Sequence, residues 1–184
     1  MESIEQRILK DGVIVDNDIL KVDSFLNHQI DVGFISDFAK GVKEAFQGTK
    51  IDKVLTVETS GIAVAFAVSE ALGNLPLLFA KKSKSKIVGD DVYKADAKSF
   101  TRGINSTFTV AHRYLSEGEN VLIVDDFLAE GNASLGLVDI CHQAKANIVG
   151  VAIVIEKLFQ GGRDALESRG IKVFAGASIK KFED

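Results

Sequence analysis

The sequence predicts an α/β fold with a mostly parallel central sheet flanked by helices. Between residues 54 and 155, short apolar runs rich in Val, Ile and Leu alternate with helical segments, which is the order of βαβ units. The runs are apolar throughout, as in strands that are buried on both faces. A length of 184 residues and a hydrophobic fraction of 46% fit one domain with a substantial core.

Each element follows from its own local pattern. Strands are expected at residues 54–57, 77–80, 107–111, 121–124, 148–155 and 171–175. Helices are expected at residues 35–46, 62–72 and 133–144, where apolar or alanine side chains recur at helical spacing. Near the N-terminus, a short helix at 4–9 and extended pieces at 13–15 and 19–22 are expected. The lysine-rich segment 83–102 has no helical period, so we expect a hairpin or a mobile loop there.

The charge balance and the single cysteine exclude several classes of protein. A net charge of −4 argues against a dedicated nucleic-acid binder, whose surface is normally basic. Cys141 falls on the apolar face of the third expected helix, which indicates a buried structural thiol. The N-terminus lacks a signal-peptide pattern, and no segment approaches the length of a membrane span. We therefore expect a cytoplasmic protein without a membrane partner.

Two adjacent acids follow the apolar run at residues 121–124. Asp125 and Asp126 lead into a small-residue turn that contains Gly131, and a helix is expected directly after it. Ligands of open α/β sheets bind at the carboxyl ends of the strands, and buried carboxylates are costly unless a polar or cationic group uses them. The amide groups at a helix start favour an anion. This pattern predicts hydroxyl or metal ligands on the acids and phosphate on the loop.

Other phosphate and metal sites fit the sequence poorly. Gly131 and Gly136 have the spacing of a P-loop, but Leu137 stands where that motif needs lysine. No G-x-G-x-x-G motif occurs, which removes the main support for a dinucleotide enzyme. The three histidines are scattered, without the short spacing of a metal site; they are His28, His112 and His142. We therefore expect no metal site built from protein ligands alone.

Residues 121–134 resemble the 5-phosphoribosyl 1-diphosphate (PRPP) signature of type I phosphoribosyltransferases, although the family loop is usually richer in Thr and Gly. Residues 20–31, 126–129 and 154–157 resemble bacterial xanthine phosphoribosyltransferases, a branch of this family, in the family's order and over nearly the whole chain. The resemblance implies a type I phosphoribosyltransferase fold in a single domain of residues 1–184. Residues 1–30 would contribute to a small hood, formed by the two ends of the chain, over the base site.

The same resemblance assigns roles to individual residues. Asp125 and Asp126 would meet the ribose hydroxyls of PRPP. The remaining PRPP contacts would come from Ala129, Glu130, Gly131, Asn132 and Ala133 at the 5′-phosphate, and from Ser60, Gly61, Lys81 and Lys82 at the pyrophosphate. The purine would meet Leu20, Asn27 and Lys157. Simpler roles stay open for three of these residues, since Lys81 and Lys82 suit a solvated surface and Asn27 suits a cap. Phe159 suits either a stacked purine or the core.

The resemblance also implies the reaction. Xanthine and PRPP would give xanthosine 5′-monophosphate and diphosphate, with Mg²⁺ held by PRPP oxygens and Asp125 and Asp126 as candidate further ligands. It implies a homodimer as well, and the 83–102 segment is a candidate lid. The first alternative is an adenine or other purine phosphoribosyltransferase. The second is a PRPP-binding regulator of purine genes, which would carry an added basic DNA-binding domain that this length and charge do not provide.

Overall fold

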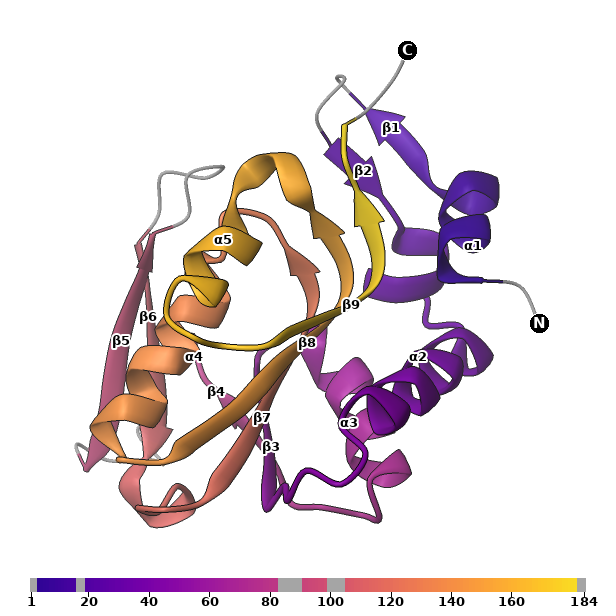
Figure 1. The fold of residues 1–184 in the computed structure, drawn as a ribbon. Coiled ribbons are helices and arrows are strands. Elements are labelled where there is room, and N and C mark those ends of the chain that lie inside the picture. Colours follow the sequence, from indigo (N-terminus) through magenta and orange to yellow (C-terminus); the bar gives the residue numbers. More distant parts are fainter. Residues whose placement is uncertain (1–2, 16–18, 83–90, 99–104, 182–184) are drawn as a thin grey trace.

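A computed structural model describes residues 3–15, 19–82, 91–98 and 105–181 (Figure 1). Its centre is a parallel sheet of five strands in the order β4-β3-β7-β8-β9. The strands are β3 (Lys53–Val57), β4 (Leu77–Ala80), β7 (Asn120–Leu128), β8 (Asn147–Lys157) and β9 (Val173–Ile179). The predicted parallel sheet with flanking helices is confirmed.

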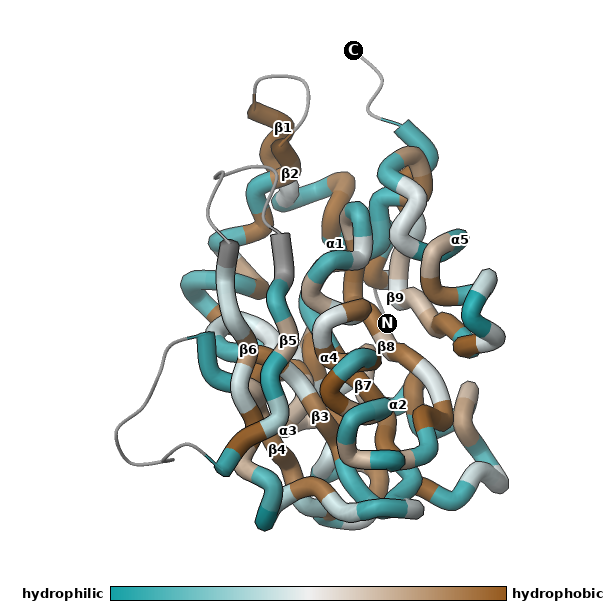
Figure 2. Tube along the Cα trace, turned by 90° about the vertical axis from the view of Figure 1, so that its left-hand side faces the viewer, coloured by the Kyte–Doolittle hydropathy of each residue, from teal (hydrophilic) through white to brown (hydrophobic). Residues whose placement is uncertain are grey.

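Both faces of the sheet are covered, as Figure 1 shows. Helices α2 (Val32–Ala45) and α3 (Gly61–Ala71) lie on one face, and α4 (Asn132–Gln143) lies on the other with the antiparallel hairpin of β5 (Val92–Lys98) and β6 (Asn105–Ala111). Along β7, Leu122 and Val124 pack toward α2 and α3, whereas Val121 and Ile123 pack toward α4. Both faces of the strand are therefore buried, and Figure 2 shows apolar segments concentrated in the central strands.

The N-terminal segment packs against this framework. It consists of α1 (Ile4–Asp11), the hairpin of β1 (Val13–Val15) and β2 (Ile19–Lys21), and a π-helical turn, η1 (Asp23–Asn27). Phe25 in η1 is fully buried, and its ring meets that of Phe34 edge-on at 5.1 Å. Arg7 in α1 lies over the Phe25 ring and pairs with Asp31 at 2.9 Å. Asp31 also accepts a hydrogen bond from the Phe34 amide at the start of α2. Arg7 therefore connects α1 to η1 and to the start of α2.

Several predicted boundaries were wrong. The strand expected at 121–124 continues to Leu128, because the backbone beyond Val124 stays in register with β8; Asp125 is opposite Ile153 and Phe127 is opposite Ile155. The last strand spans Val173–Ile179 rather than 171–175, and β6 begins at Asn105 rather than at 107. The described part of the 83–102 segment forms β5, as a hairpin requires, and the rest lies outside the described residues.

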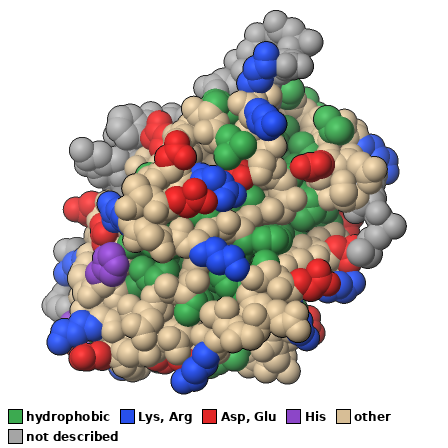
Figure 3. Space-filling model, viewed as in Figure 1, with side chains coloured by type: hydrophobic (Ala, Val, Ile, Leu, Met, Phe, Trp, Pro, Cys, Tyr) green, Lys and Arg blue, Asp and Glu red, His purple; other side chains and the backbone are tan. Residues whose placement is uncertain are grey.

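Four short elements were not predicted: η1, η2 (His112–Tyr114), η3 (Leu158–Gln160) and α5 (Gly162–Glu167). Cys141 is fully buried, and this burial raises the pKa of its thiol to about 12, which confirms a structural thiol. Within the described residues, no helix combines the length and the apolar character needed to span a membrane. On the face shown in Figure 3, Lys and Arg side chains lie interspersed with Asp and Glu.

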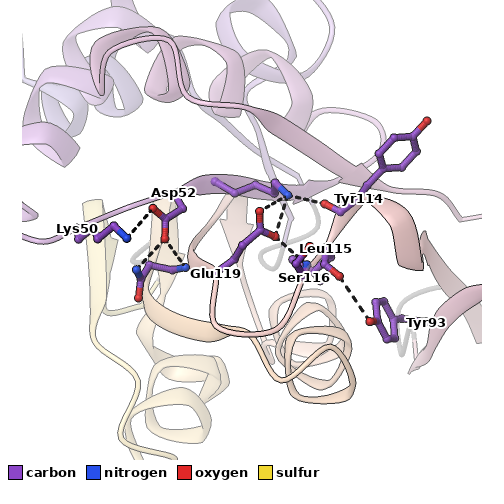
Figure 4. Close-up of polar contacts among 9 residues, drawn as sticks. Lys50, Asp52, Tyr93, Tyr114, Leu115, Ser116 and Glu119 are labelled. Carbon is purple, nitrogen blue, oxygen red and sulfur yellow. Dashed lines mark hydrogen bonds and ion pairs between the residues drawn. The ribbon is translucent and has the colours of Figure 1, made fainter.

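A polar network closes the amino-terminal edge of the sheet (Figure 4). Asp52 precedes β3, and its Oδ2 atom accepts hydrogen bonds from the Asn120 amide at 2.9 Å and the Asn120 side chain at 2.7 Å. Lys53 Nζ donates to the Tyr114 carbonyl at 2.5 Å and to the two Glu119 carboxylate oxygens at 2.7 and 2.9 Å. The Ser116 amide donates to the same carboxylate at 2.8 Å. Each acid in this network therefore has protein partners.

Candidate active site

The carboxyl ends of four neighbouring strands bring the predicted site residues to one edge of the sheet. Residues 58–61 follow β3, Lys81 and Lys82 follow β4, and Lys157 ends β8. Asp125 and Asp126 lie near the end of β7, and residues 129–131 connect this strand to α4. Since the strands are parallel, these segments leave the sheet on the same side, where open α/β sheets bind their ligands.

The two acids lie in the last residues of strand β7 and are buried. Asp125 is 5% exposed and Asp126 is 8% exposed. The Asp126 amide donates to Asp125 Oδ1 at 3.0 Å, and the Phe127 amide donates to Asp126 Oδ1 at 3.0 Å. Asn27 Nδ2, from the N-terminal segment, donates to Asp126 Oδ2 at 3.4 Å. In the described part of the chain, neither acid forms an ion pair with Lys, Arg or His.

Asp125 is poorly accommodated as an anion. Burial raises the pKa of its carboxyl well above the ordinary value of 3.8, and the neighbouring Asp126 carboxylate raises it further. The Asp126 amide and the charge of Lys82 lower this pKa in part. A polyol, a cation or a metal–substrate complex bound at this point would supply the hydrogen bonds or charge that the protein itself provides only weakly.

The phosphate loop is shaped by close glycine packing. Gly131 has a left-handed conformation, with φ of 85°, and immediately precedes α4. A Cβ atom on Gly162 would lie 2.4 Å from the Ala129 carbonyl oxygen and 2.9 Å from the Gly131 amide nitrogen. The Gly162 amide also donates to the Ala129 carbonyl at 3.0 Å. The first amides of α4 have no partners within the helix, so this turn presents donors suited to a phosphate.

Glu130 and Asn132 hold the outer side of the same turn. Asn132 Nδ2 donates to Glu130 Oε2 at 3.0 Å, and Glu130 is exposed. Ala133, in the first turn of α4, packs in part against the hydrophobic core. The predicted loop residues therefore lie together between β7 and the start of α4.

The segment after β3 touches the acid pair directly. A Cβ atom on Gly61 would lie 2.7 Å from Asp125 Oδ1 and 2.4 Å from Thr56 Oγ1, so only glycine fits against these groups. Thr56 is fully buried, and its hydroxyl has no hydrogen-bond partner among the described residues. Glu58 Oε1 accepts a hydrogen bond from the Lys82 amide at 2.5 Å, which joins this segment to the end of β4. The Glu58–Thr59 peptide bond is cis.

The end of β8 carries a buried ion pair that the sequence did not reveal. Glu156 is 2% exposed, and its carboxylate accepts two hydrogen bonds of 2.8 Å from the Arg163 guanidinium and one from the Ser178 hydroxyl. The Glu156 carboxylate raises the pKa of Arg163 above its ordinary value. Arg163 is six residues downstream of Lys157 and belongs to no recognised motif. The only hint in the sequence is Glu156, an acid within an apolar strand that would need a cationic partner.

The structure brings several of the predicted site residues into direct contact and places others at the same edge of the sheet. Asn27 contacts Asp126, and Gly61 packs on Asp125. Leu20 is nine-tenths buried and belongs to the core cluster on the α2 and α3 face. Other predicted residues lie at the same edge of the sheet, after β3, β4 and β8: Ser60, Lys81, Lys157 and Phe159. The charge of Lys82 acts on Asp125.

Comparisons with known proteins agree with this geometry. Residues 21–175 match the phosphoribosyl transferase domain. The chain belongs to the phosphoribosyltransferase family. Relatives named xanthine phosphoribosyltransferase include one from Clostridioides difficile (strain 630), 48% identical over 100% of this chain and 97% of that protein. Another, from Laribacter hongkongensis (strain HLHK9), is 47% identical with the same coverage.

Solved structures of adenine phosphoribosyltransferases share the fold of this phosphoribosyltransferase. One from Giardia lamblia, complexed with 9-deazaadenine, has a TM-score of 0.80 at 19% identity and covers 97% of this chain and 98% of its own. One from Saccharomyces cerevisiae, complexed with adenine and an imino-altritol bisphosphate, has a TM-score of 0.76 at 24% identity, covering 94% and 98%. At these identities the likeness shows the type I phosphoribosyltransferase fold alone.

Proposed function

We propose that this phosphoribosyltransferase joins xanthine to PRPP and releases xanthosine 5′-monophosphate and diphosphate. The observation that carries the proposal is the buried Asp125–Asp126 pair, set between a glycine-shaped phosphate loop and the Asn27 side chain of the N-terminal segment. Ribose hydroxyls are suited to carboxylates of this kind, and the loop suits the 5′-phosphate. Xanthine, rather than another purine, is favoured by the names of the relatives.

The chemistry asks the protein for positioning and electrostatics. The bond between the anomeric carbon and the pyrophosphate oxygen breaks, and a bond from that carbon to a purine nitrogen forms. Positive charge develops on the ribose ring in between, which the Asp125 and Asp126 carboxylates would stabilise. Ser60, Gly61, Lys81 and Lys82 would hold the leaving pyrophosphate, and Lys157 would donate to an oxygen of the purine. Fixing both substrates in line would add to the rate enhancement.

Asp126 is our candidate for the base that accepts the purine proton. It is 8% exposed and is hydrogen-bonded to Asn27, which we propose meets the purine. An Asp126→Asn variant should lose turnover, and the rate that remains should have a changed pH dependence. Full turnover with an unchanged pH profile would rule out this role.

The donor set also fits Mg²⁺. Asp125 and Asp126 offer the hard oxygen ligands that Mg²⁺ prefers, and they lack a basic partner in the described part of the chain. The described residues contain no group of three or more His, Cys, Asp or Glu side chains that could hold a metal ion. We therefore propose that PRPP oxygens supply most of the ligands. Bound in this way, the metal would neutralise the pyrophosphate and make it a better leaving group.

The direct test is to incubate the protein with PRPP, Mg²⁺ and one purine base at a time. We expect xanthosine 5′-monophosphate from xanthine, with guanine and hypoxanthine used less well and adenine least. Omission of Mg²⁺ should remove the activity. Preferred formation of adenosine 5′-monophosphate would instead favour the adenine enzyme, as would a Lys157→Ala variant that keeps full purine use.

A regulatory function is the second candidate. It would require PRPP binding without a nucleotide product, together with binding to purine-operon DNA at moderate salt. The net charge of −4 gives such binding little electrostatic support.

Residues 1–184 would act as one domain, with residues 1–30 in the hood, and two copies would pair as a homodimer. Sedimentation of the purified protein tests the dimer. The candidate lid at 83–102 lies largely outside the described residues, and a cytoplasmic location stays a prediction.

A further inference from the structure

Glu156 and Arg163 form the most enclosed ion pair that the structure describes. Glu156 is 2% exposed, and the guanidinium of Arg163 binds both of its carboxylate oxygens at 2.8 Å. The same guanidinium donates to Glu167 at 2.8 Å and to the Val173 carbonyl at 3.2 Å. A planar, two-pronged contact of this kind fixes both direction and distance, which a single lysine contact would not.

Each residue of the pair is next in the chain to a part of the candidate active site. On one side, Glu156 is followed directly by Lys157, the proposed purine ligand at the end of β8. On the other side, Arg163 follows Gly162, whose amide donates to the Ala129 carbonyl in the phosphate loop at 3.0 Å. Gly162 also packs so closely on this loop that a Cβ atom would lie 2.9 Å from the Gly131 amide nitrogen. A shift of Arg163 would therefore move both the end of β8 that carries Lys157 and the phosphate loop.

We propose that Arg163 is a positioning residue that sets the distance between the purine end of the site and the phosphate loop. Through Glu156 it fixes the end of β8, and through Gly162 it supports the turn that would hold the 5′-phosphate. The proposal rests on the proposed function, since it concerns the same two substrates. It predicts that a change at Arg163 weakens the use of the purine and of PRPP together, whereas a change at Lys157 affects the purine alone.

An ion pair at this place is weak evidence of a stabilising role. Replacing a buried pair with apolar residues of similar volume is often neutral or stabilising, whereas removal of one partner leaves an uncompensated charge and is strongly destabilising. A variant with both residues replaced can therefore separate a structural role from a positioning role. If Arg163 only supports the fold, the double replacement should restore everything that the single replacement loses.

The experiment compares Arg163→Met, the double variant Glu156→Met with Arg163→Met, and Arg169→Met as the matched control. Arg169 makes a single exposed contact with Asp139 at 3.4 Å. Thermal unfolding, KM for each substrate, and amide hydrogen exchange of residues 129–133 are measured for each. We expect the single variant to lose stability and the double variant to regain it. In the double variant both KM values should stay raised by about 10-fold or more, and the loop should exchange faster than in the wild type.

Wild-type KM values for both substrates, or an increase in only one of them, would overturn the proposal, as would unchanged exchange of the loop. If the double variant does not fold, Arg163→Lys serves instead, because it keeps the charge and loses the fork. We then expect a smaller rise in both KM values, and no rise would contradict the positioning role. Hydrogen exchange needs no turnover. An inactive wild type would therefore refute the proposed function. The exchange result would still show whether Arg163 supports the phosphate loop.

Discussion

At the amino-terminal edge of the sheet, Asp52 and Glu119 each accept several hydrogen bonds from neighbouring residues of the protein, and Glu119 also pairs with Lys53 (Figure 4). At the carboxyl-terminal edge, Asp125 and Asp126 are more deeply buried, lie next to each other, and have no ion-pair partner among the described residues. The two edges belong to the same strands, since Asn120 begins β7 and the acids lie near its end. The acids at the two edges differ in their partners although they lie on the same strands. We therefore attribute the difference to the function of each edge.

The comparison indicates where the fold stabilises itself and where it accommodates a ligand. Polar groups that find all their partners within the protein contribute to stability, whereas a buried carboxylate with few hydrogen bonds and no cation beside it lowers stability. Proteins retain such groups mainly at functional sites. Substitution of an acid should accordingly lower stability at the amino-terminal edge and lower activity at the carboxyl-terminal edge.

The largest effect is expected from removing a charge at the carboxyl-terminal edge. Asp125→Asn and Asp126→Asn should each lower kcat/KM for PRPP by about 100- to 1000-fold, because a neutral amide stabilises the positive transition state poorly. Steady-state kinetics with varied PRPP measures this. Asp52→Asn is the matched control, and it should retain wild-type kinetics. An equal loss of activity from Asp52→Asn would remove the distinction between the two edges.

A smaller loss is expected from crowding the phosphate loop without changing any charge. In Gly162→Ala, the added Cβ would lie 2.4 Å from the Ala129 carbonyl oxygen, so the loop must move. We expect KM for PRPP to rise by about 10- to 100-fold. Gly41→Ala in α2 is the control, since its Cβ would meet only the Phe174 ring, at 3.3 Å. Normal PRPP kinetics in Gly162→Ala would show that the loop adapts freely.

At the amino-terminal edge, the expected effect is on stability. Lys53 is 12% exposed in its side chain, and Lys53→Met would leave Glu119 without its cation and the Tyr114 carbonyl without a donor. We expect the free energy of unfolding to fall by about 1–3 kcal/mol while kcat stays within about twofold. Urea unfolding and an activity assay on the same preparation test both parts. A variant of unchanged stability would mean that water replaces these contacts.

Much of the carboxyl-terminal edge could be predicted from the sequence, because its motifs are local. An apolar run followed by Asp125 and Asp126 predicted the strand and the acids, and the glycine after them predicted the turn into α4. The end of the strand was wrong by four residues, since pairing with β8 overrides the local preference of two acids for a loop.

The supporting contacts could not be predicted. Arg163 and Gly162 act on residues that are distant in the sequence, and nothing in their own surroundings indicates a bidentate ion pair or a glycine packed on a loop. The π-helical turn that brings Asn27 to Asp126 is likewise fixed by burial of Phe25 and not by a repeating pattern. The resemblance pointed to Asn27. Its hydrogen bond to Asp126, 99 residues away in the sequence, depends on the tertiary fold.

The smallest expected effect is also the sharpest contrast, because the two edges should respond to pH with opposite signs. Hydrogen bonds from the Asn120 amide and side chain, together with the nearby Lys50, hold the pKa of Asp52 below its ordinary value of 3.8, against a weaker effect of burial. Asp52 therefore contributes stability above about pH 3.8, and this contribution is lost as the pH falls through its folded-state pKa. Asp125 has a raised pKa, so stability is lost as the pH rises from its unfolded value of about 3.8 through the folded-state value.

Unfolding of the ligand-free wild type, Asp52→Asn and Asp125→Asn between about pH 3 and 8 tests this contrast. At neutral pH we expect Asp125→Asn to be more stable than the wild type and Asp52→Asn to be less stable, with both differences shrinking toward the acid end. Each unit of pKa shift corresponds to about 1.4 kcal/mol, so the gain in Asp125→Asn reports how strongly burial disfavours the charge. Loss of stability in both variants would mean that the hydrogen bond from the Asp126 amide and the charge of Lys82 outweigh burial at Asp125. The carboxyl-terminal edge would then resemble the amino-terminal one.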